Sequence, residues 1–142
     1  MWGCAPVTIL QELLVLQKRA IRIINKSNYL SRTSPVFKDL VLLKLSDINF
    51  YYTVLFVYKC KHNRLPLVCN QFLTANNYIA DGSYNLRSVN EYIIPFSRTN
   101  MRTKCMNVRG PKQWRNLPDV VRNAASLSNF KTTFFSFVFA QY

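Results

Sequence analysis

Residues 8–26 read TILQELLVLQKRAIRIINK, and this stretch decides the fold class because its apolar side chains recur with the period of an α-helix. One face of the predicted helix collects the apolar residues Leu10, Leu13, Leu14, Ile21 and Ile24. Another face carries basic residues at four-residue intervals, Lys18, Arg22 and Lys26, with Arg19 beside them. Thr8 and Gln11 have the spacing of a capping box. The stretch therefore predicts an amphipathic helix with a core face and a basic face.

Further helices are predicted downstream of this first one. Ser34 and Pro35 are typical of a cap followed by proline at the first helical position, with a short helix through Leu40. A long helix should begin at Ser46 or Asp47 and end near residue 62, and its dense aliphatic and aromatic content indicates packing on several sides. A short element is expected over residues 65–73. A last helix, capped by Ser126 or Ser128, should run to about residue 140 with an apolar face of Phe130, Phe134, Phe137 and Val138.

The second half of the chain differs in character. Residues 91–95 and 101–108 are predicted to be two short strands around a turn at residues 97–100. Gly110-Pro111 would end the second strand and start a short helix that carries Trp114. We expect a mainly α fold with a small β-hairpin (α+β), divided into a helical region over residues 1–75, a loop over 76–90, and the hairpin with its two helices over 91–142.

Charge is the strongest functional feature of the sequence. Nineteen Lys and Arg face six Asp and Glu, which gives a formal net charge of +13 and a pI near 10.0. Phosphates attract Lys and Arg through counterion release, so nucleic acid is the expected partner and an anionic membrane surface the alternative. Hydrophobic residues form 49% of the chain, which is enough for a core and argues against a disordered tail.

Two groups of basic residues are the candidate nucleic-acid contacts. The first lies on the helix over residues 8–26 and the second lies between residues 98 and 115. The candidates are Lys18, Arg19, Arg22, Lys26, Arg98, Arg102, Lys104, Arg109, Lys112 and Arg115. Trp114 is a candidate platform for stacking an unpaired base, with anchorage of its helix in the core as the other interpretation. Simple solvation is the other interpretation of the basic residues.

No catalytic, metal or cofactor site is expected from the sequence. The aspartates Asp39, Asp47, Asp81 and Asp119 are far apart, which does not suit a two-metal polymerase site. The four cysteines are scattered without a C-x-x-C pair, and His62 is the sole histidine, so a structural zinc site is not expected. Three glycines cannot supply a phosphate-binding loop. We see no transmembrane helix or secretory leader, and expect an intracellular protein with reduced thiols.

Short motifs along the chain resemble those of one protein family. LQKRAIRII at residues 16–24 resembles a signature that lies downstream of the polymerase core in LINE-like (non-LTR, jockey/CR-type) retrotransposon reverse transcriptases. Other similar boxes follow in the family's order: Trp2-Gly3 before the signature, then TSPVF at 33–37, LKLSD at 43–47, FVYK at 56–59, Leu65-Pro66, YNLR at 84–87, Arg98-Thr99, VRGP at 108–111, WRNLP at 114–118, and SLSNFK at 126–131. Arg32 stands where the family usually has histidine, and Leu86 where it has threonine.

The resemblance covers nearly the whole chain and implies the C-terminal region of such a protein. The family's endonuclease and its aromatic-Ala-Asp-Asp box lie upstream, so no catalytic residue carries over. The implied parent is an RNA-directed DNA polymerase of a nuclear or cytoplasmic ribonucleoprotein, whose palm and thumb would be partners of this region. The expected role is contact with template RNA or target DNA. The alternatives are a structural packing or protein-interaction module, and a non-functional relic of a transposon.

Overall fold

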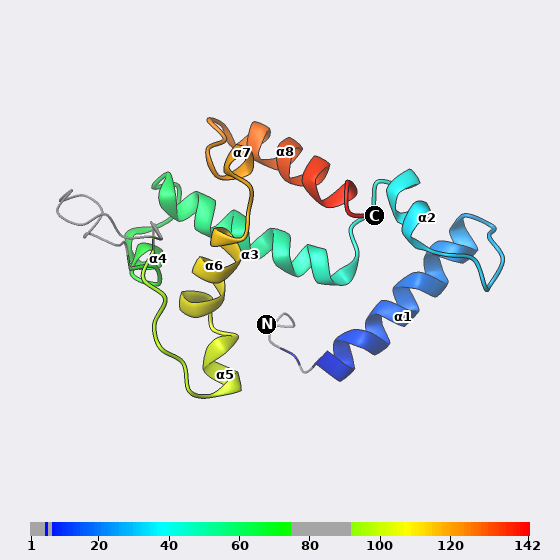
Figure 1. Cartoon of the computed structure of the whole chain (residues 1–142), viewed down its shortest axis with the longest axis horizontal. Coiled ribbons are helices and arrows are strands. Elements are labelled where there is room, and N and C mark those ends of the chain that lie inside the picture. The colour runs from blue at the N-terminus through cyan, green and yellow to red at the C-terminus, as the bar shows by residue number, and fades with distance from the viewer. Residues whose placement is uncertain (1–4, 6, 75–91) are drawn as a thin grey trace. The chain divides into compact units, whose positions relative to one another are not determined.

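The computed structural model describes residues 5, 7–74 and 92–142, and this part of the chain is mainly helical (Figure 1). Its helices are α1 (Val7–Ile24), α2 (Ser34–Asp39), α3 (Leu45–Lys61), α4 (Leu67–Asn70), α5 (Asn100–Thr103), α6 (Met106–Arg115), α7 (Asp119–Arg122) and α8 (Leu127–Phe139). The predicted mainly α class is confirmed. The helices expected over residues 8–26, 46–62 and 126–140 correspond to α1, α3 and α8. The predicted loop over residues 76–90 lies outside the described residues.

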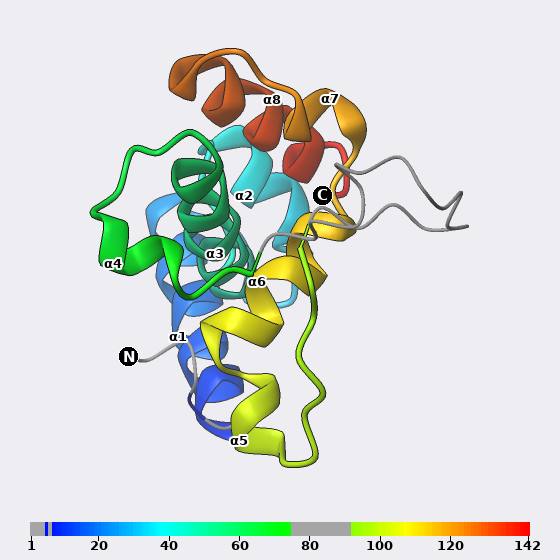
Figure 2. The same cartoon turned by 90° about the vertical axis from the view of Figure 1, so that its left-hand side faces the viewer.

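The predicted β-hairpin is wrong. Residues 101–108, expected to be its second strand, instead form most of α5 and the start of α6, while Glu91 of the first strand lies outside the described residues. The Thr99 hydroxyl accepts a hydrogen bond from the Arg102 N–H at 3.3 Å, as an N-cap does. An extended segment leads into α5, and α6 follows directly (Figure 2). Within residues 7–74 and 92–142, Tyr92 forms an isolated bridge and no β-strand is present.

The caps of the first two helices also differ from the prediction. Thr8 lies inside α1 rather than at a cap, because the helix already begins at Val7. The residue before α2 is Thr33, one position earlier than the predicted Ser34, so Ser34 and Pro35 are both inside the helix. Ser126 does cap α8 as predicted, and its hydroxyl accepts from the Asn129 N–H at 3.1 Å.

The chain forms two compact units: unit 1 comprises Met1–Tyr51 with Asn123–Tyr142, and unit 2 comprises Tyr52–Arg122. In unit 1, Ile21 of α1 packs with Val36 and Phe37 of α2, and Tyr142 packs against this cluster. Gln17 of α1 binds the chain at the start of α3: its amide nitrogen donates to the Leu43 carbonyl at 2.9 Å, and its amide oxygen accepts from the Leu45 N–H at 3.0 Å.

Aromatic rings join α8 to the first turns of α3 within unit 1. The Phe134 ring lies 5.4 Å from that of Phe50 and 5.3 Å from that of Tyr51, measured between centroids. The Phe135 ring lies 5.5 Å from that of Tyr51. Of the predicted apolar face of α8, Phe130, Phe134 and Val138 are buried and Phe137 is half-buried.

In unit 2, α6 approaches α3 closely at Gly110. A Cβ atom at this position would lie 3.1 Å from Val57 Cγ2, tighter than an ordinary van der Waals contact. Gly110-Pro111 was predicted to end a strand, but both residues lie within α6 and are buried. The absence of a side chain at Gly110 thus serves helix packing rather than a turn. Trp114, one helical turn later, is buried in the core of the same unit.

Three helices end in the same way, with a non-glycine residue in the left-handed region. After α1, Lys26 (φ 49°) donates its N–H to the Ile23 carbonyl at 3.1 Å, and Ser27 donates to Arg22 at 2.9 Å. These two bonds form a Schellman motif. Val41 (φ 53°) after α2 and Asn63 (φ 51°) after α3 occupy the equivalent position of the same motif. Glycine is usual there, because a Cβ atom strains this conformation.

Candidate nucleic-acid interface

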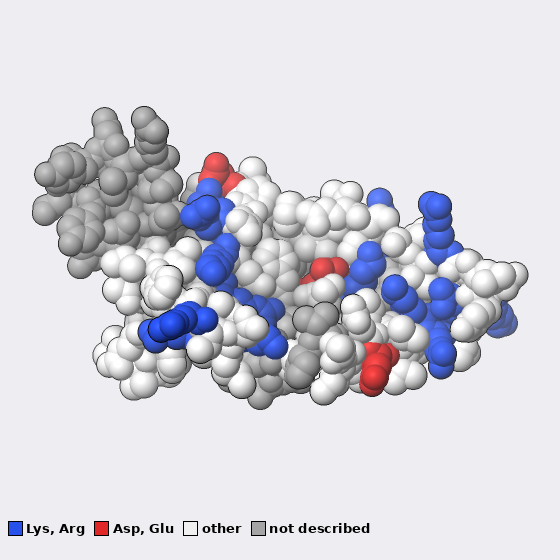
Figure 3. All heavy atoms as spheres, turned by 60° about the horizontal axis from the view of Figure 1, so that its bottom comes forward, with Lys and Arg blue, Asp and Glu red and all other residues white. Residues whose placement is uncertain are grey.

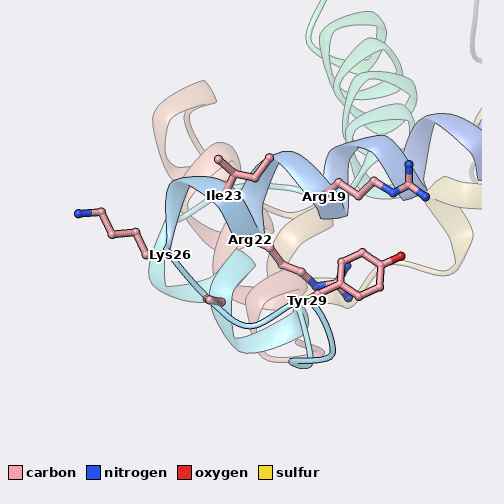
Figure 4. Close-up of a pocket in the computed structure, with 6 residues that line it drawn as sticks. Arg19, Arg22, Ile23, Lys26 and Tyr29 are labelled. Atoms are coloured by element: carbon pink, nitrogen blue, oxygen red, sulfur yellow. The ribbon is translucent and has the colours of Figure 1, made fainter.

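An open pocket of about 610 Å³ lies at the C-terminal end of α1, in unit 1. Its lining combines cationic groups with one aromatic ring, an aliphatic side chain and a hydroxyl. The lining residues are Arg19, Arg22, Ile23, Lys26, Ser27 and Tyr29. Figure 4 shows Arg22 directed toward the Tyr29 ring, with Arg19 and Lys26 extending to opposite sides of that pair. The pocket thus combines one aromatic ring with three cationic side chains, of which Arg22 lies against the ring.

Arg22 holds the pocket together because it is bound to the loop that follows the helix. Its Nε and Nη2 atoms donate to the Ser31 carbonyl oxygen, each at 3.3 Å. Its guanidinium carbon lies 5.6 Å from the centroid of the Tyr29 ring, within the range of a cation–π interaction. Arg22 therefore fixes the position of Tyr29 while keeping its own charge within the pocket.

The Schellman motif sets the direction of Lys26. This residue follows α1 in the left-handed conformation, so its side chain leaves the helix axis at a different angle from those of the preceding turn. Lys26 and Arg19 are both exposed. Among the described residues, neither has a carboxylate partner, so both cations are available to a ligand. A cation at a helix C-terminus also interacts favourably with the helix dipole.

Tyr29 is a functional candidate that the sequence prediction missed. Its side chain is 66% exposed although it is a large aromatic residue, and its ring lies against Arg22. Exposed aromatic rings beside cations are what single-stranded nucleic-acid sites use, since a base can stack on the ring while arginine or lysine binds the adjacent phosphates. The sequence does indicate this role indirectly, because this tyrosine lies in a short polar loop directly after a basic helix.

Of the residues predicted on the first helix, Arg19, Arg22 and Lys26 line this one pocket. Lys18 is half-buried and is not part of the lining. In Figure 3, Lys and Arg side chains gather over the end of α1 and the loop after it, at the right of the view. The basic face of the first helix is therefore concentrated at its C-terminal end.

The other predicted contacts belong to unit 2. Arg98, Arg102, Lys112 and Arg115 are exposed, whereas Lys104 and Arg109 are half-buried. None of these six residues lines the pocket of unit 1.

Trp114 lies in the core, as the second interpretation of this residue, anchorage of its helix, expected. Its side chain is 2% exposed, and Lys61 Nζ lies 5.6 Å from its ring centroid. A base cannot reach the ring in this conformation, so Trp114 anchors α6 rather than offering a stacking surface.

Two of the reactive side chains of unit 2, Cys60 and His62, lie in and just after α3. Cys60 is buried. Burial is the main cause that raises the pKa of its thiol, and the nearby Cys69 is a smaller cause, so the thiol stays protonated. His62 packs its ring 4.3 Å from that of Tyr58 and is exposed at the end of α3. Over residues 7–74 and 92–142, no group of three or more His, Cys, Asp or Glu side chains could hold a metal ion. None of the helices described is both long enough and apolar enough to cross a membrane.

No protein-family model, curated protein or solved structure matches this chain.

Proposed function

We propose that the chain is a non-catalytic, nucleic-acid-binding region from the C-terminal part of a non-LTR retrotransposon reverse transcriptase. In this proposal it holds single-stranded template RNA through the pocket at the end of α1, with target DNA as the second ligand. It acts within a ribonucleoprotein of the nucleus or cytoplasm. The observation that carries the binding function is the single pocket that Arg19, Arg22 and Lys26 line together with the exposed Tyr29.

The arrangement suggests a specific mode of binding. Arg22 is already held by Ser31 and Tyr29, so it contributes charge without a large loss of side-chain freedom on binding. Arg19 and Lys26 supply contacts to phosphates on either side of a base that stacks on Tyr29 (Figure 4). Such contacts distinguish an unpaired strand from a duplex, since only an unpaired base can reach the ring. They read little sequence, because phosphates and ring faces are common to all nucleotides.

The family assignment in this proposal rests on the sequence motifs, their order and their spacing. The binding function rests on the pocket and on the net charge of +13. The family assignment and the binding function are therefore independent, and either can be disproved while the other stands. A primer-extension assay of this chain by itself should detect no DNA synthesis, and synthesis would contradict the non-catalytic role.

Substitution of one cation tests the pocket against the general charge of the chain. Lys26→Gln and Lys131→Gln each remove one positive charge from an exposed lysine of unit 1, but only Lys26 lines the pocket. We expect Lys26→Gln to weaken binding of a single-stranded RNA oligonucleotide roughly fivefold and to reduce the salt slope by about one phosphate contact. Lys131→Gln should have a much smaller effect. Equal losses would show that the pocket has no special role.

A structural packing module is the second candidate function, and the exposed apolar side chains of α1 favour it. Leu13, Leu16 and Ile23 are 44%, 56% and 76% exposed. A module of this kind would bind protein rather than nucleic acid, and a folded chain that fails to bind RNA or DNA at low salt would support it.

A further inference from the structure

The apolar sector of α1 is wider than the surface that unit 1 covers. Ile21 is buried and Leu14 is half-buried. Leu13 and Ile24, which the sequence placed on the same core face, are 44% and 64% exposed. The core face predicted for this helix is therefore only partly used.

Several of the exposed apolar residues of α1 form a regular stripe, while Val15 (45% exposed) and Ile24 (64% exposed) lie beside it. The stripe positions are separated alternately by four and three residues: Ile9, Leu13, Leu16, Ala20 and Ile23. The four large side chains among them are 50%, 44%, 56% and 76% exposed, in chain order. This spacing is that of the a and d positions of a coiled coil, which pack against a second helix with the same pattern. A matching helix is therefore the occupant that the stripe fits.

The charges of α1 are divided unequally between its halves. Glu12 is the sole charged residue in the N-terminal half, whereas Lys18, Arg19 and Arg22 lie in the C-terminal half with Lys26 just beyond. A parallel pair of α1 helices would place two basic ends side by side. An antiparallel pair places each basic end beside the neutral or acidic half of the other helix, which removes that repulsion.

We propose that α1 pairs antiparallel with α1 of a second copy of this chain along the stripe. With Leu13 facing Leu16 of the partner subunit, Ile9 faces Ala20 of the partner subunit. In heptad terms Glu12 and Arg19 both occupy g positions, and this register places Glu12 opposite Arg19 of the partner subunit. The two-fold symmetry repeats every contact, so two such ion pairs flank the apolar seam.

The structure of unit 1 favours this pairing energetically. A free peptide of this length would have to order its backbone before it could pair. Here α1 is already held by Gln17 and Ile21, so much of that ordering has occurred in the monomer. Arg22 and Lys26 lie outside the seam and stay in the pocket, whereas Arg19 and Ile23 belong both to the pocket lining and to the paired face. The inference rests on the stripe and the charge division, and it does not depend on the proposed nucleic-acid function.

Sedimentation equilibrium of the full chain at physiological salt, from low to high micromolar concentration, tests the pairing. We expect a reversible monomer–dimer equilibrium. Leu16→Asp should abolish the dimer while circular dichroism shows unchanged helix content. Leu30→Asp is the matched control, because Leu30 is 86% exposed and lies off the stripe. A chain that stays monomeric at high micromolar concentration overturns the proposal, and so does a dimer that Leu16→Asp leaves intact.

A charge exchange tests the antiparallel register. Glu12→Arg alone, or Arg19→Glu alone, turns both ion pairs into repulsive pairs, and we expect each variant to raise the dimer dissociation constant roughly tenfold. The double variant restores opposite charges and should return the dissociation constant to within about threefold of the wild type. In a parallel pair these residues would not face each other. A double variant no tighter than the single variants would therefore overturn the antiparallel arrangement.

Discussion

The hydroxyl of Tyr142 donates a hydrogen bond to Oδ2 of Asp47 at 2.5 Å, which joins the last residue of the chain to the first turn of α3. The same hydroxyl accepts from the Lys44 backbone N–H at 2.8 Å. Lys44 Nζ also lies 3.8 Å from the centroid of the Tyr142 ring. Tyr142 thus stabilises the segment that leads into α3, although residues 44 and 142 are 98 positions apart in the sequence.

Removal of this hydroxyl should destabilise unit 1. Tyr142→Phe leaves the ring on Phe37 and Lys44 but removes the donor to a charged carboxylate and the acceptor for a backbone N–H. We expect the free energy of unfolding to fall by about 1–2 kcal/mol, which urea titration would measure. The conservative change of the exposed Tyr29 to Phe serves as the control and should change stability by less than about 0.5 kcal/mol.

The same residue should make stability depend on high pH. Burial, and then the hydrogen bond to Asp47, raise the pKa of the Tyr142 phenol above its ordinary value of about 10. The folded chain therefore holds this proton more tightly than the unfolded chain, so the stabilisation is complete below pH 10 and declines as the pH rises above it. Urea titrations at pH 8 and pH 11 should show a larger decline for the wild type than for Tyr142→Phe. Equal declines would show that Tyr142 does not contribute.

Val41 offers a stabilising substitution. It ends α2 in the left-handed region with φ 53°, where a β-branched side chain is unfavourable. Val41→Gly relieves that strain and, since Val41 is 65% exposed, loses little packing. We expect the free energy of unfolding to rise by about 0.5–1 kcal/mol, after allowance for the greater freedom of glycine in the unfolded chain. Leu42→Gly, one residue later, should instead destabilise, and a stabilised Leu42→Gly would contradict this explanation.

Lys26 should separate stability from binding. Lys26→Gly places glycine, the preferred residue, at the left-handed position of the Schellman motif. The same substitution removes a cation from the pocket. The variant should be as stable as the wild type or more stable in urea titration, while binding single-stranded RNA several-fold more weakly. A loss of both stability and binding would mean that the Lys26 side chain holds the fold together.

Gln17 should behave as a structural residue despite its place on the basic helix. Its side-chain amide both donates to Leu43 and accepts from Leu45, which only an amide of this reach can do. Gln17→Glu retains the acceptor and loses the donor, and Gln17→Met loses both. We expect unfolding free energies lower by about 1 kcal/mol for the first and about 1–2 kcal/mol for the second. Unchanged stability in Gln17→Met would contradict the proposed link between α1 and α3.

The long helices could be predicted because their apolar residues have a helical period over many turns. The end of α3 agrees with the prediction within a residue, and Ser126 caps α8 as expected. The hairpin prediction failed because residues 101–108 form too short a stretch to show a helical period, while the Thr99 cap favours a helix. Short segments carry few residues to distinguish the two periods, so a single cap decides the outcome.

The pocket could be predicted only in part. The basic repeat identified Arg19, Arg22 and Lys26, since helical spacing places such residues near one another. Tyr29 could not be found in the same way, because its position depends on a left-handed residue at 26 and on the bond from Arg22 to Ser31. Neither follows from periodicity. The exposed half of the apolar face of α1 was likewise hidden, because the pattern shows which residues are apolar and not which ones unit 1 covers.

The affinity of the whole chain for single-stranded RNA across a salt series, with duplex DNA measured in parallel, tests the central claim most directly. We expect tight binding at low salt, a steep loss of affinity as salt rises, and a preference for the unpaired strand that Tyr29→Ala reduces. A folded chain that binds neither nucleic acid at low salt, or whose binding is insensitive to salt, would contradict the proposed function.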